Sequence, residues 1–318
     1  MTSPVAPPAT SVQPPFAGMQ KTRSDARRRR RRRTRNFFYW GACGLALLLM
    51  VIPVVWVVGG VIARTVGGWQ WSVLTTTTEG NGGGLLNALL GTLVIVFGVL
   101  ILAGLLGVAG GVYLAEYLPA NKGHALRSAS EVLSGVPSIV LGLVGYLVLV
   151  AGGLHLGYGL LPALVVLSVL VVPYVTRSTE VAIRSVPTSY REGAEALGMP
   201  SSHILRRVVL RPALPGIATG LIFAAAIAVG ETAPLLYTAQ WSDSIPRLPL
   251  THNPVAYLTY PVYTFYNLPQ TQAHRLAYDA ALMLIVFVLV LMAAARLAVS
   301  MTQRYSPGGS RRQQRRMR

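Results

Sequence analysis

The sequence predicts an all-α integral membrane protein with six transmembrane helices and both chain ends in the cytoplasm. Three observations lead to this prediction. The chain of 318 residues is 53% hydrophobic and only 12% charged. It contains six apolar stretches, and an α-helix of about 20 apolar residues crosses a hydrocarbon core of about 30 Å. Lys and Arg gather in alternate segments between these stretches, as the positive-inside rule requires.

The six apolar stretches differ in length, and the fourth is the shortest. The third and fourth are separated by a few Gly-rich residues, including Gly157 and Gly159, which predicts a tight helical hairpin. Lipid offers no partner for peptide groups, so each stretch is expected to form an α-helix. In chain order the predicted spans are 38–63, 85–114, 132–154, 160–175, 214–238 and 276–300.

The two ends of the chain are basic. Residues 1–36 are rich in Pro and then in Arg, with an unbroken arginine run at 27–33, and are predicted to form a disordered cytoplasmic arm before the first helix at 37–63. Residues 301–318 form a basic cytoplasmic tail. The arginine run either binds anionic membrane lipids of the inner leaflet or only fixes the orientation of the first helix.

The placement of positive charge supports an even number of spans. Of the 28 Lys and Arg residues, Arg64, Arg247 and Arg275 fall in segments predicted to lie outside, and the others fall inside. A net charge of +18 in a soluble protein would suggest nucleic acid. Here the same charge follows the membrane topology, so no nucleic-acid partner is expected. The single cysteine, Cys43, excludes an internal disulfide.

A polar segment at 176–212 interrupts the apolar core that extends over 85–300, and it contains a short predicted helix. Ser189 and Glu192 have the spacing of a capping box, in which each side chain accepts a hydrogen bond from a backbone N–H of the other residue. Gly198 supplies a left-handed stop, and Pro200 prevents the helix from continuing. A helix of about two turns is not stable alone in water, so it must pack on a partner. Ser201 or Ser202 is expected to cap a second short helix at 203–210.

This segment resembles the cytoplasmic motif of bacterial ABC-importer permeases, which reads Glu-Ala-Ala, three residues, Gly, nine residues, Ile-x-Leu-Pro. Gly193 stands for the middle Ala, and Arg211 replaces the final Pro, which follows one step later as Pro212. The resemblance implies a type I ABC importer permease fold, in which the short helix couples the permease to a cytosolic ATPase. The coupling-helix residues that it implies are Glu192, Gly193, Ala194, Glu195, Leu197 and Gly198.

Three further stretches make the resemblance more specific. They are YLAEYLP at 113–119, SGVPSIVLGLVGY at 134–146 and VGETAPLLYTA at 229–239. Together they are similar to the permease subunits of bacterial phosphate ABC importers over roughly 85–299. This implies transport of phosphate, with a second homologous permease, two ABC ATPase subunits and an extracytoplasmic phosphate-binding protein as partners. The chain has no phosphate-binding Gly-rich loop, catalytic triad or metal cluster, so no cofactor or enzymatic activity is expected, and ATP with Mg²⁺ would bind the partner ATPase.

The last of these stretches holds an ionisable group in an apolar helix. Glu231 is followed by Thr232 and by Pro234, which loosens the backbone. A carboxylate inside a membrane span normally faces a pathway or a partner side chain. We therefore predict that Glu231, Thr232 and Pro234 line or gate the translocation pathway, or that Glu231 makes a structural hydrogen bond to a neighbouring helix. Ile227 occupies the position where the related permeases often carry an arginine, so a partner subunit would have to supply that charge.

The predicted external loop at 239–275 is rich in Trp, Tyr and Pro. Aromatic rings favour the membrane interface, which explains this composition without any binding role. The resemblance favours a landing site for the binding protein or a plug.

Two other transport functions are compatible with parts of the sequence. A permease for another oxyanion, such as sulfate or molybdate, would carry the same docking motif. A gradient-driven secondary transporter would show midplane charges and inverted repeats, which are not evident in this chain.

Overall fold

A computed structural model describes residues 17–118 and 123–303. The chain divides into two compact units, Met1–Gly60 and Val61–Arg318, and each is described by itself. Within the described residues, five helices are long and apolar enough to cross a membrane, and a bent helix pair makes a sixth if it counts as one span. The prediction of an all-α membrane protein is therefore confirmed.

The first unit consists of the helix α1 (Ala17–Val66), whose last residues belong to the second unit. The helix already begins at Ala17, so the prediction of a disordered arm is wrong for residues 17–36, while residues 1–16 lie outside the described part. Arginine has a high helix propensity, so an apolar helix that has formed can extend into the arginine run that precedes it. The apolar side chains between Phe37 and Val57 are exposed in the structure, as in a helix that faces lipid.

The second unit contains the other elements. Its long helices are α2 (Leu86–Val112), α5 (Leu160–Arg184), α8 (Leu210–Gly230) and α11 (Thr271–Gln303). Its shorter helices are α3 (Gly123–Ser134), α4 (Ser138–Gly145), α6 (Thr188–Ala196), α7 (Ser201–His203), α9 (Ala233–Thr238) and α10 (Thr259–Thr264). Three π-helical segments extend or join them, η2 (Tyr113–Tyr117), η3 (Tyr146–Val150) and η4 (Ile204–Val209). Two 3₁₀ turns, η1 (Trp71–Leu74) and η5 (Phe265–Asn267), and a hairpin of β1 (Thr78–Glu79) with β2 (Gly82–Gly83) complete the unit.

Two of the predicted spans are broken in the structure. The third, predicted at 132–154, corresponds to α4 with η3 and the end of α3, and the chain bends by 93° between α3 and α4 at residues 135–137. Most of α3 lies in the segment predicted to be an inside loop. Pro137 has no N–H to donate and disfavours helical geometry at the residue before it, which explains the bend. The fifth ends as a helix at Gly230 and resumes at Ala233, because Glu231 has an extended backbone with φ −73° and ψ 132°.

The fourth span is longer than predicted, since α5 continues to Arg184 instead of ending at 175. Arg177, Glu180 and Arg184 are good helix formers with (i, i+3) and (i, i+4) spacing, and opposite charges at these spacings stabilise a helix. The second and sixth spans correspond to α2 with η2 and to α11. The basic tail after Gln303 lies outside the described residues.

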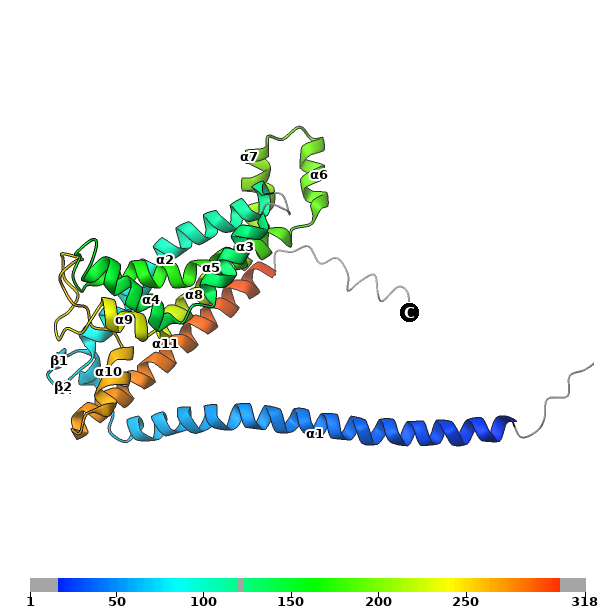
Figure 1. Ribbon diagram of the computed structural model, residues 1–318, viewed down its shortest axis with the longest axis horizontal. Coiled ribbons are helices and arrows are strands. Elements are labelled where there is room, and N and C mark those ends of the chain that lie inside the picture. Colours follow the sequence, from blue (N-terminus) through cyan, green and yellow to red (C-terminus); the bar gives the residue numbers. More distant parts are fainter. Residues whose placement is uncertain (1–16, 119–122, 304–318) are drawn as a thin grey trace, which may run out of the picture. The chain divides into compact units, whose positions relative to one another are not determined.

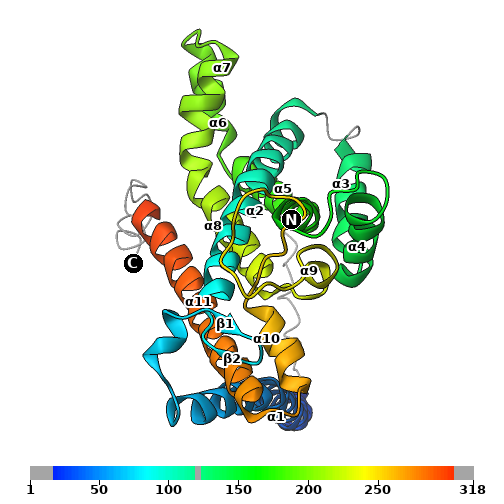
Figure 2. The same ribbon diagram turned by 90° about the vertical axis from the view of Figure 1, so that its left-hand side faces the viewer.

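Glycines allow the central helices to approach closely. A Cβ on Gly107 would lie 2.6 Å from Cβ of Val175, and one on Gly111 would lie 2.5 Å from Cβ of Thr179, so α2 packs on α5 only without side chains there. A Cβ on Gly220 of α8 would collide with Ser178 of α5. In Figure 2, α11 lies along one side of this central group, and α3 and α4 lie along the other. Small residues at helix crossings are typical of membrane bundles.

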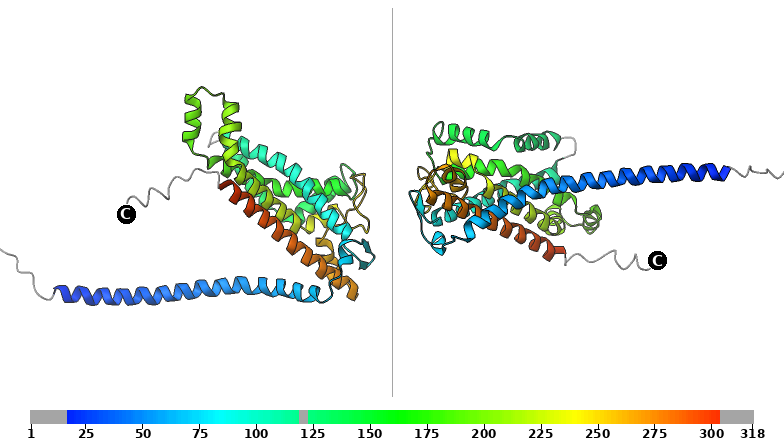
Figure 3. Two further views of the ribbon diagram at one scale, coloured as in Figure 1. Left: turned by 180° about the vertical axis from the view of Figure 1, so that it is seen from behind. Right: turned by 90° about the horizontal axis from the view of Figure 1, so that it is seen from below.

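The two ends of the second unit differ. At one end, α6 and α7 form a hairpin that projects beyond α2 and α5, close to where α11 ends (Figures 1 and 3). The β1–β2 hairpin, α10 and the loop between α9 and α10 lie at the opposite end. The candidate sites lie in the projecting hairpin and at the breaks between α3 and α4 and between α8 and α9.

The glycine contacts lead to a stability prediction. Gly107→Ala and Gly111→Ala would each force a methyl group into a helix crossing, which costs about 1–3 kcal/mol. We expect both variants to melt several degrees below the wild type in detergent. Gly110→Ala is the matched control, because its Cβ would lie 3.4 Å from the Thr176 hydroxyl, an ordinary contact. Equal melting temperatures for all three variants would contradict this account of α2–α5 packing.

Candidate functional site

The projecting helix α6 has a well-defined C-terminus. The Gly198 N–H donates to the Glu195 carbonyl at 2.9 Å, and the Met199 N–H donates to the Ala194 carbonyl at 3.2 Å. With Gly198 at φ +70°, these two bonds make a Schellman motif. The predicted left-handed stop at Gly198 is confirmed, and Pro200 lies between α6 and α7, in agreement with the prediction that it prevents α6 from continuing.

The beginnings of the two short helices differ from the prediction. Pro187 precedes the first residue of α6, and no side chain caps the helix, so Ser189 and Glu192 do not form a capping box. Proline has its φ fixed near the helical value, and this leads the chain into a helix without a serine cap. Ser201 and Ser202 also make no side-chain cap, and α7 continues without a break through η4 into α8. Because Pro212 cannot donate a hydrogen bond to the preceding turn, the ladder is loosened where η4 lies.

The predicted coupling-helix residues divide into a buried and an exposed set. Ala194 is buried against a cluster that includes Ile183 and Val209. The other five are exposed: Glu192, Gly193, Glu195, Leu197 and Gly198. Leu197 is 76% exposed, an unusual value for a leucine at the end of a helix. The exposed face of α6 thus combines two carboxylates with an apolar side chain, which suits a protein partner.

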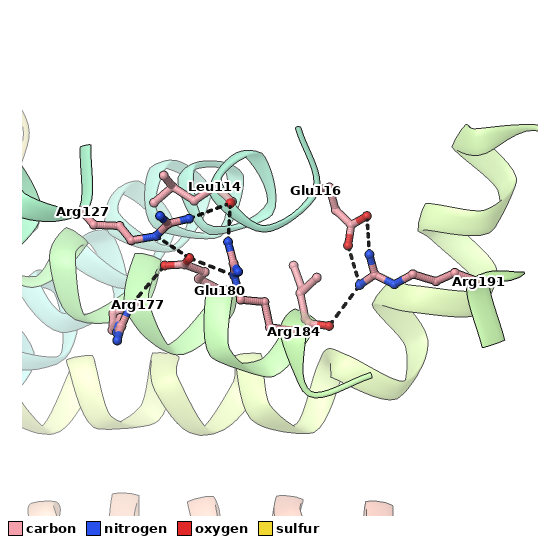
Figure 4. A network of polar contacts seen from close by, with 8 residues as sticks. Leu114, Glu116, Arg127, Arg177, Glu180, Arg184 and Arg191 are labelled. Carbon is pink, nitrogen blue, oxygen red and sulfur yellow. Dashed lines mark hydrogen bonds and ion pairs between the residues drawn. The ribbon is translucent and has the colours of Figure 1, made fainter. Parts of the chain in front are cut away.

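An ion pair with one hydrogen bond fastens α6 to η2, which continues α2. Nη1 of Arg191 lies 3.0 Å from Oε2 of Glu116, and Nη2 lies 2.8 Å from Oε1. Nη2 of Arg191 also donates to the Ile183 carbonyl at 3.3 Å. Hydrogen bonds between two charged groups are shorter and stronger than neutral ones, and the second contact of the guanidinium adds attraction between the charges. Figure 4 shows this pair beside a second ionic cluster.

The second cluster surrounds Glu180 of α5, whose side chain is only 3% exposed. Its carboxylate contacts Nε of Arg127 from α3 at 2.7 Å, Nε of Arg184 at 3.0 Å and Nη1 of Arg177 at 3.5 Å. The Leu114 carbonyl accepts hydrogen bonds from Nη2 of Arg184 at 3.2 Å and of Arg127 at 3.4 Å (Figure 4). The arginines thereby satisfy a carbonyl at the negative end of the α2 helix dipole.

Sequence reasoning treated these arginines only as positive-inside charges and did not single out Glu116 or Glu180. The spacing of Arg177, Glu180 and Arg184 was the available signal for one ionic face on a helix. Nothing local in the sequence connects Glu116 with Arg191, which are 75 residues apart.

Glu231 does not lie inside a helix, contrary to the prediction, but in the break between α8 and α9. Its side chain lies near the hydroxyl of Ser138, the first residue of α4, and its carbonyl accepts a bond from the Thr259 hydroxyl at 3.0 Å. Pro234 is buried, and a Cβ on Gly142 of α4 would lie 2.7 Å from its Cα. The helices that follow the two breaks, α4 and α9, therefore pack against each other, and Glu231 lies beside this contact.

The surroundings of the break are mainly apolar. A cavity of about 520 Å³ opens beside it, and its polar lining comes from Thr232, Thr259 and Tyr263. Ile227, at the position of the expected arginine, packs against the central apolar core. The structure thus places the predicted pathway residues Glu231, Thr232 and Pro234 at one helix break. Within the described residues, no basic side chain forms an ion pair with Glu231.

The aromatic residues of the predicted external loop fall into a set that packs together and a set that is exposed. Trp241 stacks on Tyr260 with ring centroids 4.7 Å apart and meets Phe265 edge-on at 5.4 Å, so these rings pack on one another. Tyr263 and Tyr266 are 59% and 53% exposed. Part of the aromatic content therefore has a packing role, and the exposed rings are those available to a partner or to the lipid interface.

Comparison with known proteins places this chain among transport permeases. The family model described as "Binding-protein-dependent transport system inner membrane component" matches residues 107–302. Phosphate transport system permease protein PstA 2 of Mycobacterium bovis is 53% identical over 245 residues, which cover 77% of this chain and 81% of the relative. Phosphate transport system permease protein PstA of Yersinia pestis is 32% identical over 253 residues, which cover 77% and 83%.

A solved structure agrees on the fold. The MetNI methionine ABC transporter in an inward-facing conformation gives a TM-score of 0.55 at 22% identity, over 69% of this chain and 95% of that chain. The fold predicted from the coupling motif, that of a type I ABC importer permease, is thus confirmed. By sequence and by fold, this chain belongs to the family of binding-protein-dependent transport system inner membrane components.

Proposed function

We propose that this chain is one of two membrane-spanning permease subunits of an ATP-driven phosphate importer. Its similarity to phosphate transport system permeases over more than three quarters of its length carries the proposal. A second homologous permease would complete the pathway, and an extracytoplasmic phosphate-binding protein would deliver phosphate to the end that carries α10. Both termini and α6 would then lie in the cytoplasm, in agreement with the positive-inside rule.

In this proposal α6 docks on one of two ABC ATPase subunits, which bind ATP and Mg²⁺. The exposed residues Glu192, Glu195 and Leu197 provide the contact surface, and the Gly198 stop sets the length of the helix. Closure of the ATPases would displace α6 and switch the pathway by rigid-body movement, with the free energy coming from ATP. Glu231, Thr232 and Pro234 would belong to the pathway at the point where the two broken helices meet.

The energy source can be tested in vesicles that contain the complete importer. We expect phosphate uptake to continue with internal ATP when ionophores collapse the proton and sodium gradients, because no gradient drives the proposed cycle. Sulfate and molybdate should not compete with labelled phosphate. Uptake that stops with the gradients would favour a secondary transporter, and competition by the other oxyanions would favour the second substrate class.

Substitution of the helix stop tests the role of α6. Proline cannot adopt the positive φ of Gly198 and cannot donate its bond to Glu195, so Gly198→Pro should distort the end of α6 and lower phosphate uptake roughly tenfold or more. Asparagine tolerates the left-handed conformation, and Gly198→Asn should keep most of the uptake. The protein should still insert and assemble with the second permease in both variants. Equal uptake by Gly198→Pro and wild type would refute the docking assignment.

The proposed pathway residue Glu231 can be tested by separating its charge from its hydrogen bond. Glu231→Gln keeps an oxygen that can accept a bond from the nearby Ser138 hydroxyl, whereas Glu231→Ala removes it. We expect the alanine variant to lose uptake roughly tenfold or more, and the glutamine variant to stay within about threefold of wild type, because a carboxylate repels phosphate and is not needed as a ligand. An equal defect in both variants would show that the charge itself is required.

A further inference from the structure

Contacts within the second unit form a continuous path from α6 to the helix break at Glu231. Resting on the proposed function, we propose that the ion pairs of Arg191 with Glu116 and of Arg127 with Glu180 are positioning contacts that transmit a displacement of α6 to α3. From α3 the displacement passes to the break before α4. Helix α3, most of which precedes the span predicted at 132–154 and was not predicted as a helix, is thus assigned as the transmission element.

The first step is the attachment of α6. Within this helix Ala194 is the buried side chain, so apolar packing alone holds it weakly. The ion pair of Arg191 with Glu116 ties it to the end of η2, and the two side chains are 25% and 17% exposed. The same guanidinium also donates to the Ile183 carbonyl of α5, so a displacement of Arg191 is felt by both η2 and α5.

The second step joins the end of α2 to α3. Arg127 of α3 donates to the Leu114 carbonyl, two residues before Glu116 in the chain. The same guanidinium contacts Glu180 at 2.7 Å. A carboxylate that is 3% exposed is too costly to leave without its partners, so the elements that supply its arginines move together.

The third step leads to the candidate pathway. Helix α3 ends at Ser134, the chain turns by 93°, and α4 begins at Ser138. Gly142 of α4 packs against Pro234 of α9, which follows the break at Glu231. Because the turn contains Gly135 and Pro137 rather than a continuous helix, a tilt of α3 changes the angle at this bend. The displacement then reaches both helix breaks at once.

Another route runs through the chain itself, from α6 through α7 and η4 into α8. This route is continuous helix from Ser201 to Gly230 and does not involve Arg191 or Arg127. The two routes make different predictions for variants that break the ion pairs and leave the chain path intact.

The first test measures phosphate imported per ATP hydrolysed, in vesicles that contain the complete importer. We expect Glu116→Gln and Arg191→Gln each to lower this ratio roughly tenfold. The ATPase should remain bound and active, because the exposed face of α6 is unchanged. The exchanged pair, Glu116→Arg with Arg191→Glu, should restore the ratio to within about threefold of wild type. Arg207→Gln is the matched control, an exposed arginine in η4 of the neighbouring segment, and should have no effect.

The second test follows α3 directly by pulsed electron paramagnetic resonance on the assembled complex. Spin labels replace Ala129 of α3 and Val290 of α11, both exposed, and Cys43→Ser removes the native free thiol. In the wild-type background we expect the distance between the labels to change when a non-hydrolysable ATP analogue binds. In Arg191→Gln the analogue should still bind, and the change should be lost.

The outcomes separate this inference from the proposed function. If the wild-type complex recruits no ATPase or imports no phosphate, the proposed function fails, and the inference fails with it. If the wild type transports phosphate, and Arg191→Gln keeps the same ratio of phosphate to ATP, only the inference is overturned. A label distance that does not respond to nucleotide in wild type, or that responds equally in both backgrounds, also overturns it.

Discussion

Glu180 carries a carboxylate into the interior of a helix bundle, and the elements around it are arranged to neutralise this charge. An ionised carboxylate that is almost completely buried requires partners, and here α3 supplies Arg127 while α5 itself supplies Arg177 and Arg184. The two arginines that also bind the Leu114 carbonyl bring the end of α2 into the same group. One buried charge therefore fixes the positions of three helices at the end of the unit from which α6 projects.

The glycines of α2 and α8 complement this constraint along the length of the bundle. Since lipid provides no hydrophobic force between helices, α2, α5 and α8 depend on close packing at Gly107, Gly111 and Gly220. The close-packed centre behaves as one body, whereas the outer elements contain breaks and π-helical segments. Such irregular backbone is tolerated at membrane depth where other protein covers it, and it provides the places at which the structure can bend.

The broken helices give the candidate pathway its form. Two segments far apart in the chain, α4 after one break and α9 after the other, come together where Gly142 approaches Pro234, and Ser138 lies near Glu231. In an unbroken helix, the backbone N–H and C=O groups are hydrogen-bonded to one another within the helix. The break after α8 places Thr232 beside a cavity that Thr259 and Tyr263 also line. Under the proposed function, these groups would form the polar part of a route for the anion. The charge that binds phosphate would then come from the second permease.

The sequence by itself determined the membrane class, the identity of most spans, the family and the helix stop at Gly198. These features depend on composition, on the length of apolar runs and on a left-handed turn that glycine favours, all of which are local properties. It did not determine where spans bend, because Pro137 and the residues around Glu231 are compatible with either a kinked or a broken helix until their neighbours are known. The sequence also predicted serine N-caps for the two short helices, whereas Pro187 and Pro200 occupy the N-cap positions in the structure. Only the tertiary structure paired Glu116 with Arg191 and surrounded Glu180 with arginines, because an ion pair between distant segments depends on how helices cross, and that geometry is set by side-chain packing over the whole bundle.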